Sequence, residues 1–542
     1  MNGAELVVRC LQGEGVKYCF GLPGEENLEL LRALSDSPIK TIITRDERGA
    51  AFMANAYGRF TGMPGVCFST LGPGATNLVT GVADGLLDFA PMVAITAQAS
   101  SLRRHKESHQ YIDTLSLFRA ITKWNVAIER TEIIPESIRK AFRLAAIEKP
   151  GPTHIELPED TALMEAKGSP IEPVAYHYPV CDEDRLKTAA GLIRDSKMPI
   201  ILAGHGAIRN RVSAELVRFA QRAGIAVATT FMGMGAIAAD HELFVSNIGL
   251  QSRDYIQCGI DKADLIIAVG YDPVEFSPKW WDNTKRIIHI DTNPAEVDIN
   301  YVALEVLGDM AKNLHMLTEL ITDTKDYSYY LKLREDLQAD LLDGAMTSSE
   351  KGLSPLTIIR AIRNALKRDD ILISDVGAHK IWIGRCYPAY EPNTVIISNG
   401  FASMGVALPY AITASLLYPQ RRILAAVGDG GFMMSACELE TAVRMGLAFT
   451  VVIFNDNGYG LIQWKQHNRY KSDFFVGLSN PDFVKLAESF GCKGYRVEKA
   501  HELESALKET ALEKVPTIVE CLVDYSVNLK LTERLGSIVC RV

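Results

Sequence analysis

Short apolar runs rich in β-branched residues alternate with amphipathic helical patterns along almost the whole chain of 542 residues. Parallel strands need long crossover connections, and these connections are usually helices. The alternation therefore predicts an α/β fold built of mainly parallel sheets flanked by helices. We expect strands at residues 16–20, 41–44, 65–69, 92–96, 200–203, 226–229, 265–269, 286–290, 371–374, 422–427, 449–454 and 517–522.

Two polar stretches interrupt this alternation and predict the limits of three domains. Residues 158–182 hold four prolines and little apolar periodicity, and residues 322–352 are polar and charged. Both compositions are typical of linkers between compact units. We therefore expect domains at residues 1–165, 183–322 and 353–542, and the similar alternation in the first and third suggests a shared fold.

Composition and charge exclude several classes of protein. The chain carries 57 Lys and Arg against 66 Asp and Glu, a net charge of −9, whereas a nucleic-acid-binding protein normally presents a basic face. No apolar run approaches the roughly 20 residues needed to cross a bilayer. Residues 1–15 read as an amphipathic helix without the apolar core of a signal peptide, and the ten cysteines include no C-x-x-C pair. We therefore expect a cytoplasmic protein with reduced thiols that binds neither nucleic acid nor membrane.

The strongest candidate site lies in two loops that follow strands of the third domain. Residues 428–431, G-D-G-G, make a tight turn into a helix, and residues 455–460, N-D-N-G-Y-G, follow the next strand. Ligands of open α/β sheets bind at the carboxyl ends of the strands, and glycines let backbone N–H groups approach a phosphate. Asp429 and Asp456 offer oxygen ligands to a hard cation such as Mg²⁺. The alternative is a pair of solvent-facing turns, since D-G and N-G are common turn dipeptides, but the 24 residues between Gly430 and Asn455 favour a site.

This pair of loops resembles the diphosphate- and Mg²⁺-binding motif of thiamine diphosphate (ThDP) enzymes, G-D-G followed at similar spacing by N-N. Here Asp456 stands at the second Asn, which keeps an oxygen ligand and adds a negative charge. The resemblance implies that the Asp429 and Asp456 side chains and the Gly458 carbonyl hold the cation. It also implies diphosphate contacts from Gly430, Gly431 and Tyr459.

The similarity extends over nearly the whole chain, and in the first domain it singles out Glu47. This residue follows an expected strand and precedes an apolar helix. In the superfamily a Glu at this position hydrogen-bonds the aminopyrimidine ring of the cofactor. The thiazolium C2–H is a poor acid, and a carboxylate partner favours the imino form of that ring, which acts as the base. The resemblance therefore implies a catalytic role for Glu47, whereas the alternative is an ordinary surface carboxylate.

Five further loops resemble cofactor loops of the family. Residues 21–24 imply a cofactor contact from Gly24, and residues 71–77 match a G-P-G-x-x-N turn that shapes the site. Residues 108–110 resemble an F-Q-E region, which implies that Gln110 lies near substrate and cofactor. His109, in place of the aromatic ring, is either a proton shuttle or a polar lining residue. The remaining implied contacts are Gly377, Ala378 and His379 at the diphosphate, and Ala402 and Met404 where a bulky residue props the cofactor into its bent shape, the alternative for Met404 being a place in the core.

Within the superfamily the chain is similar to acetolactate synthases, and more to the catabolic, FAD-independent type than to the anabolic one. Residues 270–278, G-Y-D-P-V-E-F-S-P, and residues 524–528 match the catabolic pattern, whereas anabolic enzymes carry R-F-D-D in the first segment to support FAD. Residues 203–207, A-G-H-G-A, lack the full G-x-G-x-x-G run of a dinucleotide site. The expected cofactors are therefore ThDP and Mg²⁺ without FAD, bound to a chain of pyrimidine-binding, central and diphosphate-binding domains.

The resemblance implies decarboxylation of a 2-oxo acid, with pyruvate as the expected substrate, and carboligation to a second 2-oxo acid to give 2-acetolactate. It also implies a homodimer or homotetramer whose active sites are shared between subunits. The alternatives are a non-oxidative 2-oxo acid decarboxylase, a 2-hydroxyacyl lyase, a pyruvate oxidase, which needs flavin, and a non-catalytic scaffold that retains the fold. Intact Glu47, Asp429 and Asp456 argue against the scaffold.

Two features depart from the family pattern. Glu25 and Glu26 follow the first glycine loop where synthases have small residues or, in the catabolic type, a Lys. A carboxylate there repels the substrate carboxylate unless it is protonated or paired. We expect both to point outward as acids at a helix N-terminus, whereas the alternative is a substrate other than two pyruvates. Gln463 and Trp464 resemble a Q-W pair that contacts the acceptor, but their spacing from the preceding loop is one residue shorter.

Overall fold

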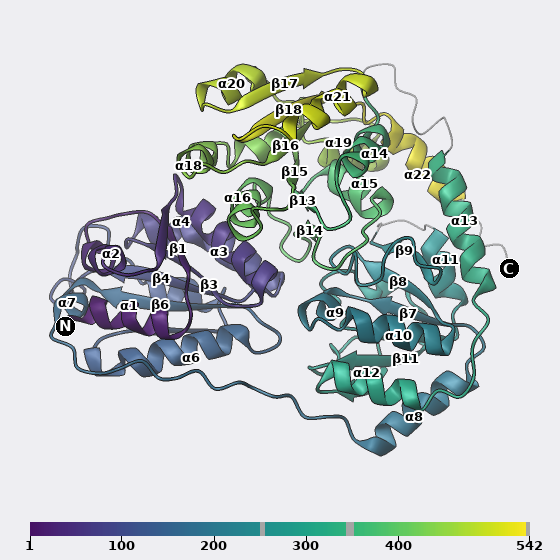
Figure 1. Ribbon diagram of the computed structural model, residues 1–542, viewed down its shortest axis with the longest axis horizontal. Helices are drawn as coiled ribbons and strands as arrows, with labels where there is room; N and C mark the ends of the chain where they lie inside the picture. Colours follow the sequence, from purple (N-terminus) through teal and green to yellow (C-terminus); the bar gives the residue numbers. More distant parts are fainter. Residues whose placement is uncertain (250–254, 343–351, 538–542) are drawn as a thin grey trace. The chain divides into compact units, whose positions relative to one another are not determined.

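Three six-stranded sheets, each flanked by helices, make up the fold (Figure 1). The computed structural model describes residues 1–249, 255–342 and 352–537. Within these ranges every pairing between the named strands is parallel, so the predicted α/β fold with three parallel sheets is confirmed. The chain forms two compact units, one of Met1–Tyr176, Gly400–Pro419 and Ser435–Leu447, the other of His177–Asn399, Gln420–Met434 and Ala448–Val542.

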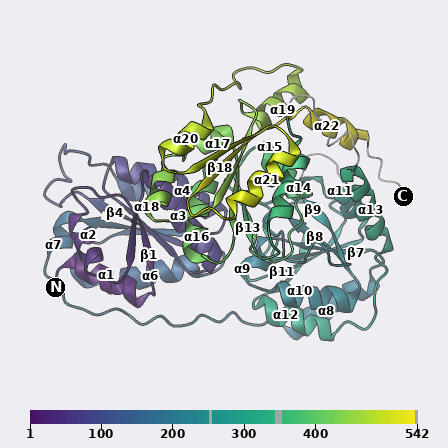
Figure 2. The same cartoon turned by 45° about the horizontal axis from the view of Figure 1, so that its top comes forward.

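The first unit contains the N-terminal sheet, in the strand order β2-β1-β3-β4-β6-β5. Its strands are β1 (Tyr18–Gly21), β2 (Lys40–Ile43), β3 (Gly65–Ser69), β4 (Met92–Gln98), β5 (Trp124–Ala127) and β6 (Pro152–Pro158). Its helices are α1 (Gly3–Gly13), α2 (Leu28–Ser35), α3 (Glu47–Thr61), α4 (Pro73–Leu87), α5 (Thr114–Arg119), α6 (Ile134–Ala146) and α7 (Glu159–Leu163), with the short η1 (Thr131–Ile133). Two later helices also belong here: α16 (Ala407–Leu417) packs on α3, and α18 (Glu438–Arg444) lies beside α16 (Figure 2).

The second unit contains two sheets. The central sheet has the order β12-β11-β10-β7-β8-β9, and the C-terminal sheet has the order β14-β13-β15-β16-β18-β17. The central elements are α8 (Glu183–Asp195), β7 (Pro199–Ala203), α9 (His205–Arg209), α10 (Ser213–Ala223), β8 (Ala226–Thr230), β9 (Phe244–Ile248), α11 (Tyr255–Lys262), β10 (Leu265–Val269), η2 (Pro278–Trp280), β11 (Arg286–Asp291), β12 (Ala303–Leu307), α12 (Met310–Glu319) and α13 (Ser328–Leu342). The C-terminal elements are α14 (Pro355–Ala365), β13 (Ile371–Ser374), α15 (Ala378–Cys386), β14 (Val395–Ile397), β15 (Ile423–Gly428), α17 (Asp429–Met433), β16 (Thr450–Asn455), α19 (Gly460–Tyr470), α20 (Phe483–Ser489), β17 (Lys493–Val497), α21 (Ala500–Thr510), β18 (Thr517–Leu522) and α22 (Val527–Ser537).

The described structure contains six strands that the sequence pattern does not predict, namely β5, β6, β9, β12, β14 and β17. Five of them form the edge of a sheet, where one side of the strand lacks a partner. Four of these strands are only partly buried, and β14 is three residues long. The sixth, β6, is buried along its whole length but carries His154 and Glu156 between two prolines. Interior strands read as continuous apolar runs, and the predicted bounds 65–69, 265–269, 371–374 and 517–522 coincide with β3, β10, β13 and β18.

His154 on β6 predicts a pH dependence of stability. Its ring is buried, stacks on Phe118 with 4.0 Å between ring centroids, and places Nε2 2.8 Å from Thr96 Oγ1. Burial lowers the pKa of His154 to about 3, whereas an unfolded chain titrates it near about 6.5. Between these values the unfolded state binds more protons, so the free energy of unfolding falls as pH falls, by about 1.4 kcal/mol per pH unit.

Thermal unfolding scans from neutral pH down to mildly acidic pH measure this effect. We expect the Tm of the wild type to fall with pH, and we expect a shallower fall in His154→Gln, which has no proton to gain in this range. The exposed control His177→Gln should keep the wild-type slope. Equal slopes in the wild type and in His154→Gln would contradict the prediction.

Both expected linkers contain a helix that their composition did not predict, α7 in residues 158–182 and α13 in residues 322–352. Residues 322–352 contain α13, which buries Tyr330 and Leu333. Asp340 in its last turn pairs with Arg385 of α15 at 2.9 Å, and both side chains are buried. The buried residues of α13 share one helix face, but exposed apolar residues such as Leu342 hide that pattern in the sequence. In the other expected linker, residues 166–182 form neither helix nor strand, and the domain limits drawn from these linkers stay predictions.

The prediction of reduced thiols is wrong at one position. Cys258 is disulfide-bonded, which local spacing could not show because it carries no information on pairing between distant cysteines. Cys10, Cys19, Cys67 and Cys521 are buried free thiols. None of the helices in the described ranges combines the length and apolarity that a bilayer crossing demands.

Candidate active site

Glu47 is held at the carboxyl-terminal edge of the N-terminal sheet. In the turn after β2, Asp46 caps α3 by accepting a hydrogen bond from the Arg48 amide at 2.7 Å, so Glu47 is the first residue of that helix. The Arg45 and Asp46 amides both donate to Oε1 of the buried Glu438, each at 3.1 Å. These contacts fix the turn and therefore the place of the Glu47 carboxylate.

The Glu47 carboxylate is buried against the G-P-G turn. Asn77 Nδ2 donates to Oε2 at 3.0 Å, and a Cβ added to Gly74 would lie 3.1 Å from Oε1. Gly72 has φ of +52°, and a Cβ there would lie 2.4 Å from the Gln110 carbonyl oxygen. Because these glycines allow the close approach, one turn borders both Glu47 and the backbone of Gln110, whose own side chain is exposed.

The loop after β1 brings Gly24 and Glu26 to the same turn. A Cβ on Gly24 would lie 2.4 Å from Thr70 Cβ, and Thr70 Oγ1 donates to Glu26 Oε2 at 3.0 Å. Glu25 is exposed, as expected. The expectation that Glu26 points outward is wrong: its side chain is 6% exposed and pairs with Arg103. Local sequence could not reveal this burial, because Arg103 lies on a separate loop.

Asp429 lies at the centre of a hydrogen-bonded cluster at the end of β15. The Gly430 amide donates to Oδ1 at 2.9 Å and the Gly458 amide donates to Oδ2 at 3.1 Å. Asn480 Nδ2 donates to Asp429 Oδ2 at 2.6 Å and to Asn455 Oδ1 at 3.0 Å. The two predicted loops therefore meet. Sequence reasoning missed Asn480, since no motif marks it.

Asp456 shares this buried environment. Burial raises the pKa of Asp429, while burial and then the charge of Asp429 raise the pKa of Asp456 to about 7. Two close buried carboxylates suit a hard divalent cation, which neutralises both, so this donor set fits Mg²⁺. Among the described residues no third His, Cys, Asp or Glu joins them, and a carbonyl oxygen such as that of Gly458 is the natural further ligand.

A side chain at either of the two positions that follow Asp429 would crowd a neighbouring side chain. A Cβ on Gly430 would lie 2.9 Å from Tyr459 Cε1, and a Cβ on Gly431 would lie 3.1 Å from Asp375 Oδ1. The absence of side chains at these two positions lets a ligand come close to the backbone at the start of α17, and this fits a diphosphate.

His379 offers an unpaired ring nitrogen beside these loops. The ring is buried, stacks on Phe454 with centroids 5.4 Å apart, and would lie 2.9 Å (Nδ1) from a Cβ on Gly377. Burial lowers the pKa of His379 to about 3, so the ring is uncharged at physiological pH. Its buried Nε2 has no hydrogen-bond partner in the described structure, which fits contact with a phosphate oxygen of a ligand.

The remaining predicted residues divide between the two units. In the first unit, the Gly400 amide donates to Asp88 Oδ1 at 2.7 Å and Ala402 has φ of +58°, in a loop that leaves Met404 partly exposed, which argues against a core role for Met404. The exposed His109 also lies in the first unit. The first unit thus holds Gly24, Glu47, Gln110, Ala402 and Met404, and the second holds Gly377, Ala378, His379, Asp429, Gly430, Gly431, Asp456, Gly458 and Tyr459.

The Q-W pair on α19 makes contacts within the C-terminal domain. Trp464 packs against its hydrophobic core and donates from Nε1 to Thr532 Oγ1 of α22 at 2.8 Å. Gln463 Nε2 donates to Asp473 at 2.7 Å. These contacts indicate a structural role for Trp464.

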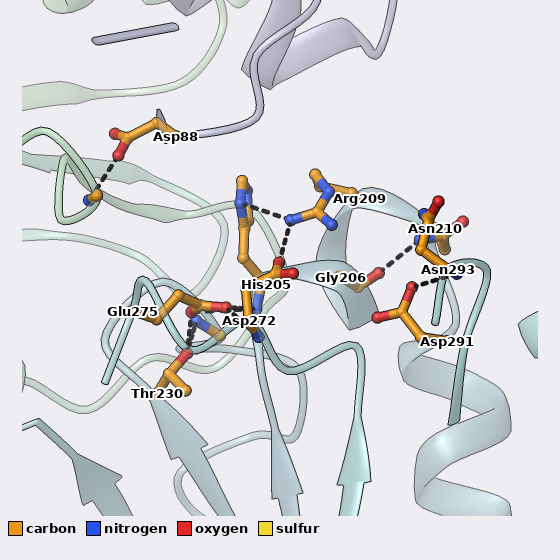
Figure 3. A network of polar contacts seen from close by, with 12 residues as sticks. Asp88, His205, Gly206, Arg209, Asn210, Thr230, Asp272, Glu275, Asp291 and Asn293 are labelled. Atoms are coloured by element: carbon orange, nitrogen blue, oxygen red, sulfur yellow. Dashed lines mark hydrogen bonds and ion pairs between the residues drawn. The ribbon is translucent and has the colours of Figure 1, made fainter. Parts of the chain in front are cut away.

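The G-H-G turn of the central domain is filled by its own side chains (Figure 3). The His205 amide lies 2.9 and 3.2 Å from the two Glu275 carboxylate oxygens, and the Thr230 hydroxyl also donates to Glu275. Asp272 pairs with Arg209 at 3.0 Å, and both are buried. Burial and then the charge of Asp272 raise the pKa of Glu275 to about 8. In dinucleotide-binding folds the amides at such a helix N-terminus bind phosphate, and here Glu275 takes that position.

Comparison with known protein families covers all three sheets. Residues 1–117 match "Thiamine pyrophosphate enzyme, N-terminal TPP binding domain", residues 186–317 match the central domain of the same family, and residues 375–521 match its C-terminal TPP binding domain. The match confirms the predicted resemblance to ThDP enzymes.

The most similar relatives include acetolactate synthases, which identify the group of ThDP enzymes to which the chain is related. The chain is 34% identical to the acetolactate synthase of Bacillus subtilis (strain 168), over 98% of this chain and 94% of that protein. It is 36% identical to the catabolic acetolactate synthase of Raoultella terrigena, over 98% and 97%. A probable acetolactate synthase large subunit of Methanocaldococcus jannaschii is 35% identical, over 97% and 92%. The chain matches all three domains of ThDP enzymes and is more than 30% identical to these synthases over nearly its whole length. It therefore belongs to the acetolactate synthase family of ThDP-dependent enzymes.

Proposed function

We propose that the protein decarboxylates pyruvate and joins the resulting two-carbon unit to a second pyruvate, giving 2-acetolactate with ThDP and Mg²⁺ as cofactors. The buried Glu47 carboxylate, held by Asn77 at 3.0 Å at the edge of the sheet, is the observation that carries the proposal. The proposal includes a cytoplasmic homodimer or homotetramer, with domains at residues 1–165, 183–322 and 353–542.

The residues of this chain have separate tasks in the proposed mechanism. Asp429, Asp456 and the Gly458 carbonyl hold the cation, and His379 contacts a phosphate oxygen. Bound ThDP supplies the electron sink for decarboxylation. Glu47 holds a proton on its carboxylate near the aminopyrimidine ring, and its burial keeps bulk water from competing for that hydrogen bond. In this proposal Gln110 contacts the substrate.

FAD has no part in the proposed reaction. The Glu275 carboxylate accepts the His205 amide and sits beside the paired Asp272, so a flavin phosphate would meet two acidic groups there. Because the His205 amide already donates to Glu275, it is not available to bind a flavin phosphate, and this supports a flavin-independent reaction over a pyruvate oxidase.

A product assay with pyruvate, ThDP and Mg²⁺ but no flavin tests this function. A synthase consumes two molecules of pyruvate for each CO₂ and each acetolactate that it releases, and acid converts the acetolactate to acetoin for measurement. Release of CO₂ with acetaldehyde would make the protein a decarboxylase. No pyruvate consumption by a protein that binds ThDP would overturn pyruvate as the donor.

Mixing two inactive variants tests the proposal of shared sites. If each site combines Glu47 of one subunit with Asp429 of its partner, Glu47→Gln and Asp429→Asn subunits in a mixed dimer form one intact site. Random exchange should therefore restore about a quarter of the wild-type activity. Exchange is followed by mass spectrometry of differently tagged subunits. Demonstrated exchange without recovery of activity would show that both residues act within one subunit.

A further inference from the structure

Glu26 is a buried carboxylate where the proposed reaction needs to receive an anionic substrate. Its side chain is 6% exposed, and its Oε2 accepts a hydrogen bond from Thr70 Oγ1 at 3.0 Å. Burying a charge is costly unless it is paired. The group that pairs with Glu26 is therefore the cation nearest to this buried charge.

That pairing group is Arg103, which joins three loops at the same edge of the N-terminal sheet. Arg103 Nη2 lies 3.4 Å from Glu26 Oε1 in the loop after β1. Its Nε and Nη2 donate to Glu159 Oε1, at the start of α7 after β6, at 3.1 and 2.9 Å. The loop that carries Arg103 is itself anchored, because the Ser100 amide also donates to Glu159 Oε1 at 3.1 Å. Two acids from two loops thus orient one guanidinium group.

The Arg103 guanidinium still has N–H groups that can donate to a ligand after these contacts are made. Arginine has five N–H donors, and Nη1 of Arg103 makes no hydrogen bond in the described part of the chain. About a third of the side chain, 32%, is exposed. A planar fork of this kind binds a carboxylate with good geometry.

The position of this pair relative to Glu47 follows from Thr70 and Gly74. A Cβ on Gly74 would lie 2.9 Å from Thr70 Cγ2 and 3.1 Å from Glu47 Oε1. Since the Thr70 hydroxyl bonds Glu26, the Glu26 and Glu47 carboxylates lie on either side of one small turn. An anionic substrate that enters here is repelled by both carboxylates unless a cation meets it.

We propose that Arg103 binds the carboxylate of the 2-oxo acid substrate, with Glu26 and Glu159 acting as positioning residues that orient its guanidinium. The inference rests on the proposed function and deepens it. Arg103, which lies on a different loop from Glu25 and Glu26, supplies the positive charge there. Arg103 is thereby the residue that makes the site specific for substrates with a carboxylate.

Steady-state kinetics of Arg103→Met tests the proposal. We expect the KM for pyruvate to rise by about tenfold to a hundredfold, because a charge-assisted pair is lost. Methyl pyruvate, which has no carboxylate, serves as a competing ligand, and its inhibition constant should stay within about twofold of the wild-type value. The exposed Arg119→Met on α5 is the matched control and should leave both constants unchanged.

Glu26→Gln tests the positioning role. Loss of the ion pair that orients Arg103 should raise the KM for pyruvate by about twofold to fivefold and leave the methyl pyruvate inhibition constant unchanged, whereas loss of a residue that only tethers loops would raise both. If Arg103→Met does not fold, Arg103→Lys replaces it, with an expected rise in KM of about threefold to tenfold from the lost fork.

The outcomes separate this inference from the function on which it rests. A wild-type protein that consumes no pyruvate with ThDP and Mg²⁺ overturns the proposed function and this inference with it. An active wild type with an unchanged pyruvate KM in Arg103→Met overturns the inference alone. A parallel rise in both the pyruvate KM and the methyl pyruvate inhibition constant also overturns it, because such a rise indicates a general distortion of the loops.

Discussion

Glu47→Gln should lower pyruvate turnover about a thousandfold, within the range that general acid–base catalysis contributes. The amide of Gln has nearly the shape of the carboxylate and still accepts the Asn77 hydrogen bond, but it cannot hold a proton for the cofactor ring. We expect the loss in kcat rather than in ThDP affinity, because the residues proposed to hold the diphosphate and the cation are unchanged. Stopped assays of acetolactate and CO₂, together with a ThDP titration, measure both quantities.

A matched control excludes a general effect of charge removal. Glu129 is an exposed acid of the same unit, and Glu129→Gln should retain wild-type turnover and ThDP affinity. Glu47→Gln that keeps more than about a tenth of the wild-type turnover would exclude Glu47 as the group that activates the cofactor.

Asp429→Asn should weaken the binding of Mg²⁺ and ThDP roughly a hundredfold, the upper end of what even outer-shell metal partners cost. Asp429 carries one of the two buried charges that suit the cation, and the amide removes that charge. The Tm of the cofactor-free protein should stay close to that of the wild type, because relief of repulsion with Asp456 offsets a lost hydrogen bond. The rise in Tm on adding ThDP and Mg²⁺ should disappear at concentrations that saturate the wild type.

The exposed Asp369→Asn in the same domain is the matched control and should show the full cofactor-induced rise in Tm. A wild-type cofactor response in Asp429→Asn would show that the cation is held elsewhere. A lower Tm of the cofactor-free Asp429→Asn protein than of the cofactor-free wild type would indicate a structural role for Asp429 instead.

Most interior strands could be predicted from the chain, because a strand buried on both faces is apolar at most of its positions. This is why the predicted bounds of β3, β10, β13 and β18 coincide with the structure. Edge strands such as β5 and β17 escape the same reasoning, since their residues are only partly buried. β6 escapes it for another reason: its His154 and Glu156 are buried polar residues whose partners come from other elements.

Some features of the candidate site could likewise be predicted from the sequence, and others could not. The G-D-G-G and N-D-N-G loops and the strand-end position of Glu47 are short-range features, and sequence spacing alone identified them. The residues that hold these loops in place come from distant parts of the chain. Glu438 bonds the Asp46 amide across 392 residues of chain, Asn480 reaches Asp429 across 51, and Arg103 meets Glu26 across 77.

The sequence by itself therefore determined the α/β class, the interior strands and the residue types at the two candidate cofactor loops, because period, burial and turn chemistry act over a few residues. Only the tertiary structure decided that Glu26 is buried and paired, that α13 packs where a linker was expected, and that Glu275 occupies the amide of a dinucleotide-like turn. These outcomes depend on which loops come into contact when the parallel strands form a sheet. The free energy of burying a charge depends on the partner that lies next to it in the folded protein.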